Sequence, residues 1–301
     1  MNRFALVGLV MMSLCAAALA ADKTSENDAR LKRALERNPK ADGDGDGVLT
    51  HDEARAFFAK QKKKTSKPRG TQQPMAAAAG KLYEKRELKN EDGKTLRYFV
   101  MKPASGKKQK FPLVVCLHGR GGNTTAASVL AGDKMRKDYP CYVIAPVSRS
   151  DRVWAVPEGV SKLKGEHALP LVFDAIDKLK EEFSDIDFTR VYVTGQSMGG
   201  FGSFGAVSLR PYLFAAAAPI CGGWSPKEAT RMKGTAFWVF HGADDKTVPV
   251  DRSRDMVAAL KKAGATTKYS EYKGVGHGSW SRAYADAELW KWMFNQKRAK
   301  N

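Results

Sequence analysis

Three scarcities limit what this chain of 301 residues can be. It has only four cysteines, too few for a fold held together by disulfide bonds. Beyond residue 20 it has no apolar run of about 18 residues, so we expect no internal membrane span. Acidic residues are outnumbered, 32 against 51 basic ones, and the net charge of +19 points to anionic partners such as acidic glycans, membrane surfaces or nucleic acid. A hydrophobic share of 43% is ordinary for globular proteins and excludes a disordered chain.

Residues 1–20 have the pattern of a signal peptide. Arg3 precedes a short apolar stretch, and Ala18-Leu19-Ala20 supplies the small residues of a cleavage site. We therefore predict a secreted or periplasmic protein, cleaved after Ala20. The alternatives are a membrane anchor, for which the stretch is short, and a lipoprotein modified at Cys15, which follows too large a residue. Cleavage would leave three cysteines, an odd number, so at least one stays unpaired within the chain.

Composition divides the chain into four segments. We predict a signal peptide at 1–20, an EF-hand-like calcium-binding segment at 21–60, a basic flexible linker at 61–80 and a catalytic domain at 81–301. The linker prediction rests on the run KQKKKTSKPR, which carries six basic residues and no acidic one. Such a run is usually a solvated spacer, and the alternative is a site for polyanions.

The stretch DGDGDGVLTHDE matches the twelve-residue loop of an EF-hand. Carboxylates stand at positions 1, 3 and 5, a glycine at position 6 allows the sharp turn, and a glutamate at position 12 can bind calcium through both oxygens. The predicted ligands are Asp42, Asp44, Asp46, Val48 through its carbonyl, Thr50 and Glu53. We expect a structural calcium ion rather than a sensor, because extracellular calcium would keep the site filled. The alternative is an acidic linker that binds nothing specifically.

Residues 81–301 alternate between strand-like and helix-like patterns. The expected strands are 82–88, 96–101, 112–117, 141–145, 191–194, 215–219, 236–240 and 268–272, and the expected helices include 169–182, 199–209 and 251–262. Several middle strands are continuous apolar runs, which is typical of parallel strands buried on both faces. The pattern predicts an α/β fold, with a mostly parallel sheet flanked by helices and an antiparallel edge.

A predicted strand that ends in Gly-Gln-Ser-Met-Gly, residues 195–199, carries the clearest catalytic signal. The two glycines allow a strained turn that exposes the hydroxyl of Ser197, which needs a base to act as a nucleophile. Asp245 and His277 each follow a later predicted strand, so nucleophile, acid and base occur in the order typical of α/β hydrolases. Asp244 is the adjacent alternative for the acid.

The stretches LHGRGGN, YVTGQSMGGFGSF, AAAAPICGG, FHGADDKTVPV and GVGHGSW lie within residues 82–296. With them the chain resembles secreted α/β-hydrolase esterases, the carboxylesterase and "predicted peptidase" group related to polyhydroxybutyrate depolymerases and feruloyl or acetylxylan esterases. The resemblance implies an α/β-hydrolase fold with Ser197 as nucleophile, Asp245 as acid and His277 as base. It also implies an oxyanion hole made by the backbone amides of Arg120 and Met198. His118 and His241 are expected to be structural.

The sequence thus predicts an exported serine carboxylesterase for short-acyl or aryl esters, with plant or algal polysaccharides among the candidate substrates. Trp154, Trp224 and Trp280 are the candidate substrate-binding surfaces, because an aromatic ring can stack on a sugar or an aryl acid. No organic cofactor and no nucleic-acid partner are expected, and the oligomeric state is left open. The alternatives are a serine peptidase of the same fold and a non-catalytic, calcium-dependent binding protein on a hydrolase scaffold.

Overall fold

The computed structural model describes residues 24–65, 80–104, 109–122, 124–149, 151–157 and 165–299. The chain forms two compact units, Met1–Thr71 and Gln72–Asn301. The predicted signal peptide lies outside the described residues. Within the described residues, no helix has the length and apolar character needed to cross a bilayer.

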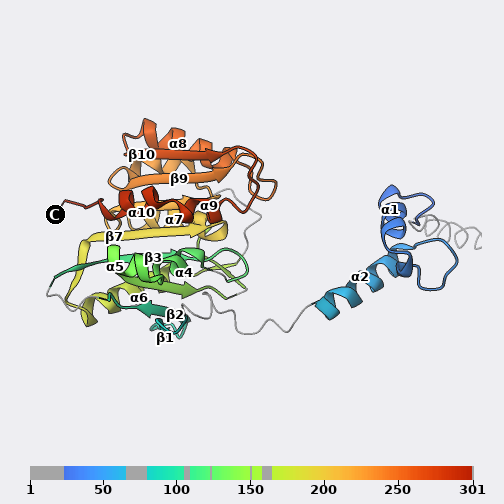
Figure 1. Ribbon diagram of the computed structural model, residues 1–301, viewed down its shortest axis with the longest axis horizontal. Helices are drawn as coiled ribbons and strands as arrows, with labels where there is room; N and C mark the ends of the chain where they lie inside the picture. The colour runs from blue at the N-terminus through green and yellow to red at the C-terminus, as the bar shows by residue number, and fades with distance from the viewer. Residues whose placement is uncertain are drawn as a thin grey trace, which may run out of the picture. The chain divides into compact units, whose positions relative to one another are not determined.

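In the first unit, α1 (Ala29–Arg37) and α2 (His51–Thr65) flank the acidic loop, with the short 3-10 helix η1 (Pro39–Ala41) between them (Figure 1). The side chain of Asp28 caps α1 by accepting from two backbone amides of its first turn. Helix α2 extends to Thr65, so the linker predicted at 61–80 begins too early. The first residues of the predicted linker, Gln-Lys-Lys-Lys-Thr, include strong helix formers. A run of basic residues does not by itself end a helix. Residues 66–79 lie outside the described residues.

The inner edge of the acidic loop pairs with the segment that precedes α1. The backbone N–H of the fully buried Leu49 donates to Ser25 Oγ at 2.8 Å, and its carbonyl accepts from Ser25 N at 2.8 Å. Thr24 and Thr50 form an antiparallel bridge beside this pair. The buried backbone groups of Leu49 are thereby satisfied by the chain's own preceding residues.

The second unit contains an eight-stranded sheet in the order β1-β2-β4-β3-β7-β8-β9-β10. The strands are β1 (Glu84–Lys89), β2 (Thr95–Met101), β3 (Phe111–Leu117), β4 (Tyr142–Val147), β7 (Ile186–Gln196), β8 (Ala216–Ile220), β9 (Ala236–Gly242) and β10 (Thr267–Tyr272). The β1–β2 and β2–β4 pairs are antiparallel and the other pairs are parallel. This arrangement confirms the mostly parallel sheet with an antiparallel edge.

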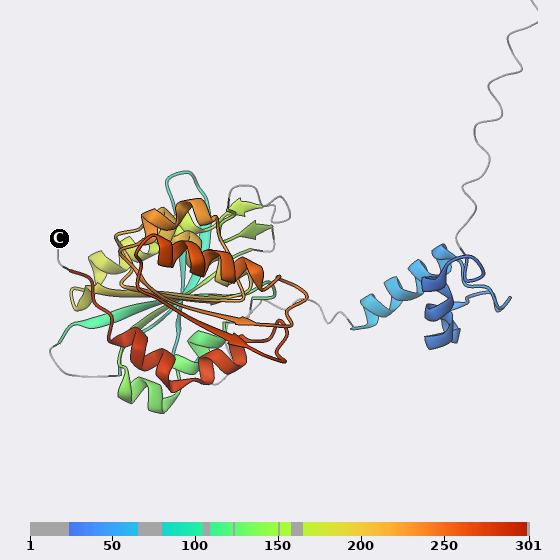
Figure 2. The same ribbon diagram turned by 90° about the horizontal axis from the view of Figure 1, so that it is seen from above.

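Helices cover both faces of this sheet (Figure 2). They are α4 (Thr125–Leu130), α5 (Asp133–Asp138), α6 (Leu169–Glu182), α7 (Met198–Leu209), η2 (Pro226–Met232), α8 (Asp251–Lys262), α9 (Trp280–Ala285) and α10 (Ala287–Phe294). One core joins the sheet to α6, α7 and α8, and the second joins it to α4, α9 and α10. Alternate residues of β3 enter different cores, Leu113 and Val115 the first, Val114 and Cys116 the second. The apolar run in this strand is continuous because both of its faces are buried.

Cys116, Cys141 and Cys221 are buried with free thiols. Burial raises the pKa of the Cys141 thiol to about 12 and raises that of Cys116 as well. These two side chains therefore act as small apolar groups in the core.

Helix α7 lies unusually close to the sheet because its first turn contains glycine. A Cβ added at Gly200 would lie 2.3 Å from the carbonyl oxygen of Ile220 in β8, and backbone cannot give way as a side chain can. We predict that Gly200→Ala lowers the free energy of unfolding by about 1–3 kcal/mol, a fall in Tm of roughly 3–10 °C. Thermal unfolding followed by circular dichroism measures this.

Gly234→Ala is the matched control, because a Cβ at Gly234 would meet no atom within 4 Å. Its Tm should stay within about 2 °C of the original protein. An equal fall in Tm for both variants would contradict the argument from close packing.

Candidate active site

Ser197 occupies a strained turn between β7 and α7. Its backbone angles are φ 55° and ψ −116°, a region that a residue with a side chain seldom adopts. A Cβ at Gly195 would lie 2.4 Å from the carbonyl oxygen of Gly199, and one at Gly199 would lie 2.1 Å from that of Leu117. Only glycine fits at these two positions, and the turn directs the Ser197 hydroxyl away from the sheet.

Ser197, His277 and Asp245 form one chain of hydrogen bonds. His277 Nε2 lies 2.9 Å from Ser197 Oγ, and His277 Nδ1 lies 2.7 Å from Asp245 Oδ2. The three residues follow the carboxyl ends of β7, β10 and β9, the edge of a parallel sheet at which ligands bind in open α/β folds. Because an ionised carboxylate only accepts, His277 carries its proton on Nδ1 and leaves Nε2 free to accept from the serine hydroxyl.

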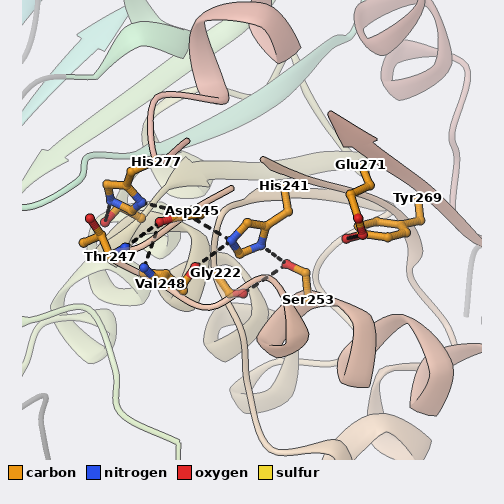
Figure 3. Close-up of polar contacts among 10 residues, drawn as sticks. Gly222, His241, Asp245, Thr247, Val248, Ser253, Tyr269, Glu271 and His277 are labelled. Carbon is orange, nitrogen blue, oxygen red and sulfur yellow. Dashed lines mark hydrogen bonds and ion pairs between the residues drawn. The ribbon is translucent and has the colours of Figure 1, made fainter. Parts of the chain in front are cut away.

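The carboxylate of Asp245 is fully buried and well supplied with donors (Figure 3). Its Oδ1 accepts from the backbone amides of Thr247 at 2.8 Å and Val248 at 2.9 Å. Burial opposes the charge, but the hydrogen bonds from His277 and these amides outweigh it and hold the pKa of Asp245 below its ordinary value. Asp244 is exposed, so the geometry selects Asp245 as the residue that orients His277.

A cavity of about 530 Å³ opens at the serine. It is lined by Gly119, Arg120, Gly121, Gln196, Ser197, Met198, Phe201, Thr247, Val248, His277 and Trp280. Arg120 and Met198, the two residues predicted to supply oxyanion amides, both belong to this lining. Met198 is the first residue of α7, where backbone N–H groups lack partners within the helix and the helix dipole favours negative charge. Phe201 also lines the cavity and was not predicted, although its place one turn into the helix that follows Ser197 could have indicated it.

The three predicted tryptophans have different environments. Trp280 lines the cavity, with its ring edge-on to His277 at 5.3 Å between centroids. Trp154 and Trp224 are buried in the core beneath α7, so their prediction as substrate-binding surfaces is wrong. Added Cβ atoms at Gly202 and Gly205 would clash with Trp154 and Trp224, which shows how closely α7 packs on both rings. The two rings fill the space that the glycines leave open. Burying their apolar surface there is more favourable than exposing it at the rim of the cavity.

His118 is a neutral, buried side chain that fixes the loop before the cavity. Its Nδ1 lies 2.7 Å from the carbonyl oxygen of Gly119, and its Nε2 accepts from the amide of Ser148 at 2.9 Å. Burial lowers its pKa to about 4. The carbonyl of His118 in turn accepts from Trp154 Nε1 at 2.8 Å.

The acidic loop of the first unit has the oxygen donors that a calcium ion prefers. Carboxylate oxygens of Asp42, Asp44 and Asp46 lie within 4.8 Å of one another. Glu53 reaches back over the loop, where Oε1 accepts from the Gly43 amide and Oε2 from the Thr50 amide. These acceptor-rich groups, which are exposed or half-buried, fit a hard cation, and the left-handed φ of 86° at Gly47 makes the turn between them.

The sheet topology together with a Ser-His-Asp arrangement at the carboxyl ends of its strands defines an α/β hydrolase. Residues 104–296 match the Dienelactone hydrolase family, and the chain belongs to this family.

Curated relatives include esterases that share part of the chain. Poly(3-hydroxyalkanoate) depolymerase C of Paucimonas lemoignei is 33% identical over 149 residues, which are 48% of this chain and 35% of the relative. A probable carboxylesterase SOBER1-like of Arabidopsis thaliana is 30% identical over 118 residues, 37% of this chain and 45% of the relative. The chain thus spans less than half the length of these two relatives.

Among solved structures, a thermostable esterase superposes with a TM-score of 0.68 at 35% identity, over 72% of this chain and 64% of the esterase. A ferulic acid esterase superposes with a TM-score of 0.54 at 17% identity, over 70% of this chain and 98% of that protein. An acylaminoacyl peptidase of Pyrococcus horikoshii superposes with a TM-score of 0.54 at 18% identity, over 73% of this chain and 42% of the peptidase. The last two show the shared fold alone.

The difference between Asp244 and Asp245 provides a direct test of the site. We predict that Asp245→Asn lowers kcat for p-nitrophenyl acetate by about 10⁴-fold, because an amide at this position can stabilise the wrong tautomer of His277. Asp244→Asn removes the same charge one residue away and should keep kcat within about twofold. Steady-state kinetics of the two variants measure the contrast, and equal losses would contradict the assignment.

Proposed function

We propose that the chain is an exported serine carboxylesterase that hydrolyses short-acyl or aryl esters. The observation that carries this proposal is the continuous chain of hydrogen bonds from Asp245 through His277 to Ser197. Ser197, at the end of this chain, lines a cavity. Membership in the Dienelactone hydrolase family and the esterases among the relatives support the same reaction type. Export is proposed on the sequence of residues 1–20 alone.

The reaction follows from these roles. His277 Nε2 takes the proton of Ser197 as its oxygen attacks the ester carbonyl, while Asp245 stabilises the imidazolium that forms. The amides of Arg120 and Met198 stabilise the negative charge on the carbonyl oxygen, a contribution of about 3–4 kcal/mol per donor in such sites. His277 then returns the proton to the leaving alcohol, and water activated by the same histidine releases the acid.

The lining of the cavity favours a compact acyl group. Phe201, Trp280 and Val248 supply apolar contacts beside the serine, and a volume of about 530 Å³ accommodates a short acyl or a single aryl group. A polymer-linked ester of this kind, including one on plant or algal polysaccharide, is the proposed natural substrate class. The relative named as a poly(3-hydroxyalkanoate) depolymerase is consistent with this choice.

We predict turnover of p-nitrophenyl acetate, p-nitrophenyl butyrate and methyl ferulate, with kcat/KM for the palmitate ester at least about tenfold lower than for the butyrate. Ser197→Ala should lower kcat by about 10⁶-fold, because removal of the nucleophile leaves only the oxyanion donors and binding. Absorbance assays on the mature chain measure both effects. Retained turnover in Ser197→Ala, or cleavage of peptide amides in preference to these esters, would contradict the proposal.

We also propose that the first unit binds one structural calcium ion. The ligands would be Asp42, Asp44, Asp46, the Val48 carbonyl, Thr50 and Glu53, in agreement with the spacing of the loop. The support is the cluster of carboxylate oxygens and the return of Glu53 over the loop. When bound, the ion would fix the loop between α1 and α2.

For this site we predict one bound calcium per chain by isothermal titration calorimetry of the mature protein. Glu53→Gln should weaken the affinity by about tenfold or more, because affinity follows the charge and number of the ligands. Asp52→Asn removes the same charge at a loop position without a ligand role and is the matched control. Equal affinities for the two variants, or no heat of binding, would contradict calcium binding by this loop.

A further inference from the structure

His241 is a second histidine in contact with the acid of the proposed triad. It lies near the end of β9, and neither its side chain nor that of Asp245 has exposed surface. His241 Nε2 lies 3.2 Å from Asp245 Oδ2, the same oxygen that accepts from His277. It also lies 3.0 Å from the carbonyl oxygen of Val248, as Figure 3 shows. One ring nitrogen therefore contacts two residues, Asp245 and Val248, of the loop that carries the acid.

The surroundings fix which nitrogen of His241 carries the proton. Both groups at Nε2, a carbonyl and a carboxylate, are acceptors, so Nε2 is the donor. Burial lowers the pKa of His241 and keeps the ring neutral, so Nδ1 has a free lone pair. The hydroxyl of Ser253 in α8 lies 2.7 Å from Nδ1 and 3.1 Å from the Gly222 carbonyl oxygen. With Nδ1 unprotonated, both neighbours are acceptors, and the single proton of the hydroxyl is shared between them.

We propose that His241 is a positioning residue that holds Asp245 Oδ2 in line with His277 Nδ1, and that Ser253 keeps His241 in the required tautomer. This inference rests on the proposed esterase function. Each oxygen of the buried carboxylate then faces two donors, Oδ1 the two loop amides and Oδ2 the two imidazoles. Without the His241 donor, Oδ2 would retain His277 alone, and the carboxylate could rotate away from the line to Ser197.

A histidine that merely filled space would affect stability but not the chemistry of His277. The two roles separate when ring volume and hydrogen bonding are changed independently. His241→Phe keeps a ring of similar size and removes both nitrogens, whereas His241→Gln keeps an amide N–H near the position of Nε2. A positioning role requires that Gln restores activity that Phe does not.

The experiment compares kcat and KM for p-nitrophenyl acetate in the wild type, His241→Phe and His241→Gln. We expect His241→Phe to lower kcat about ten- to hundredfold with KM within about twofold, the loss typical of one hydrogen bond to a charged group. His241→Gln should recover most of this loss. In an Asp245→Ala background, His241→Phe should lower kcat by no more than about twofold further, because its partner is absent. Unchanged kcat in His241→Phe, or losses that multiply in the double variant, would overturn the proposal.

Two further measurements keep the test decisive. If His241→Phe does not fold, Ser253→Ala replaces it and should lower kcat about three- to tenfold, whereas an unchanged kcat would overturn the proposal. If the wild type hydrolyses no ester, the proposed function fails while the positioning role is still tested by proton NMR. The low-field resonance of the His277 Nδ1 proton should then shift or broaden in His241→Phe and Ser253→Ala, and an unchanged resonance in both would overturn the proposal.

Discussion

The candidate site depends on keeping one fully buried carboxylate, that of Asp245, ionised. A buried charge is costly unless donors surround it, and the donors here come from three parts of the fold. The loop after β9 supplies two amides, the loop after β10 supplies His277, and β9 itself supplies His241, which α8 holds through Ser253. Satisfying this carboxylate therefore fixes the relative positions of β9, β10 and α8, and so the position of His277 beside Ser197.

The serine is positioned by a second constraint, the close approach of backbone to backbone. Gly195, Gly199 and Gly200 let β7, α7 and β8 approach within distances that a Cβ would forbid. The gain is a short, rigid turn that holds Ser197 at a positive φ, a strain that only well-packed surroundings maintain. The buried rings of Trp154 and Trp224 provide that packing along the same helix, which explains why neither is available at the cavity.

Local pattern predicted the parts of this structure that local physics determines. The middle strands are continuous apolar runs because both of their faces are buried, and all eight strands of the large sheet were predicted. The glycines beside Ser197 predicted a strained turn. The fate of Trp154 could not be predicted, because an aromatic ring is equally suited to a core and to a cavity rim. The contact between His241 and Asp245 was also missed, since their ring and carboxylate face each other only after the loop between them closes. Residue type set the chemistry that was available, and packing decided which groups meet.

The two units differ in how their folds are stabilised. The second has two large cores, one on each face of its sheet, which is sufficient apolar burial for a domain of its size. In the described part of the first unit, the buried cluster comprises only Leu31, Ala41, Leu49 and Ala54. Small units of this kind usually need a disulfide or a metal to offset the entropy lost on folding, and the buried cysteines all belong to the second unit. A calcium ion in the acidic loop would supply that stabilisation. The pairing of Ser25 with Leu49 satisfies the backbone groups on the inner edge of the loop. The fold of its own unit thus supplies a physical reason for the proposed ion.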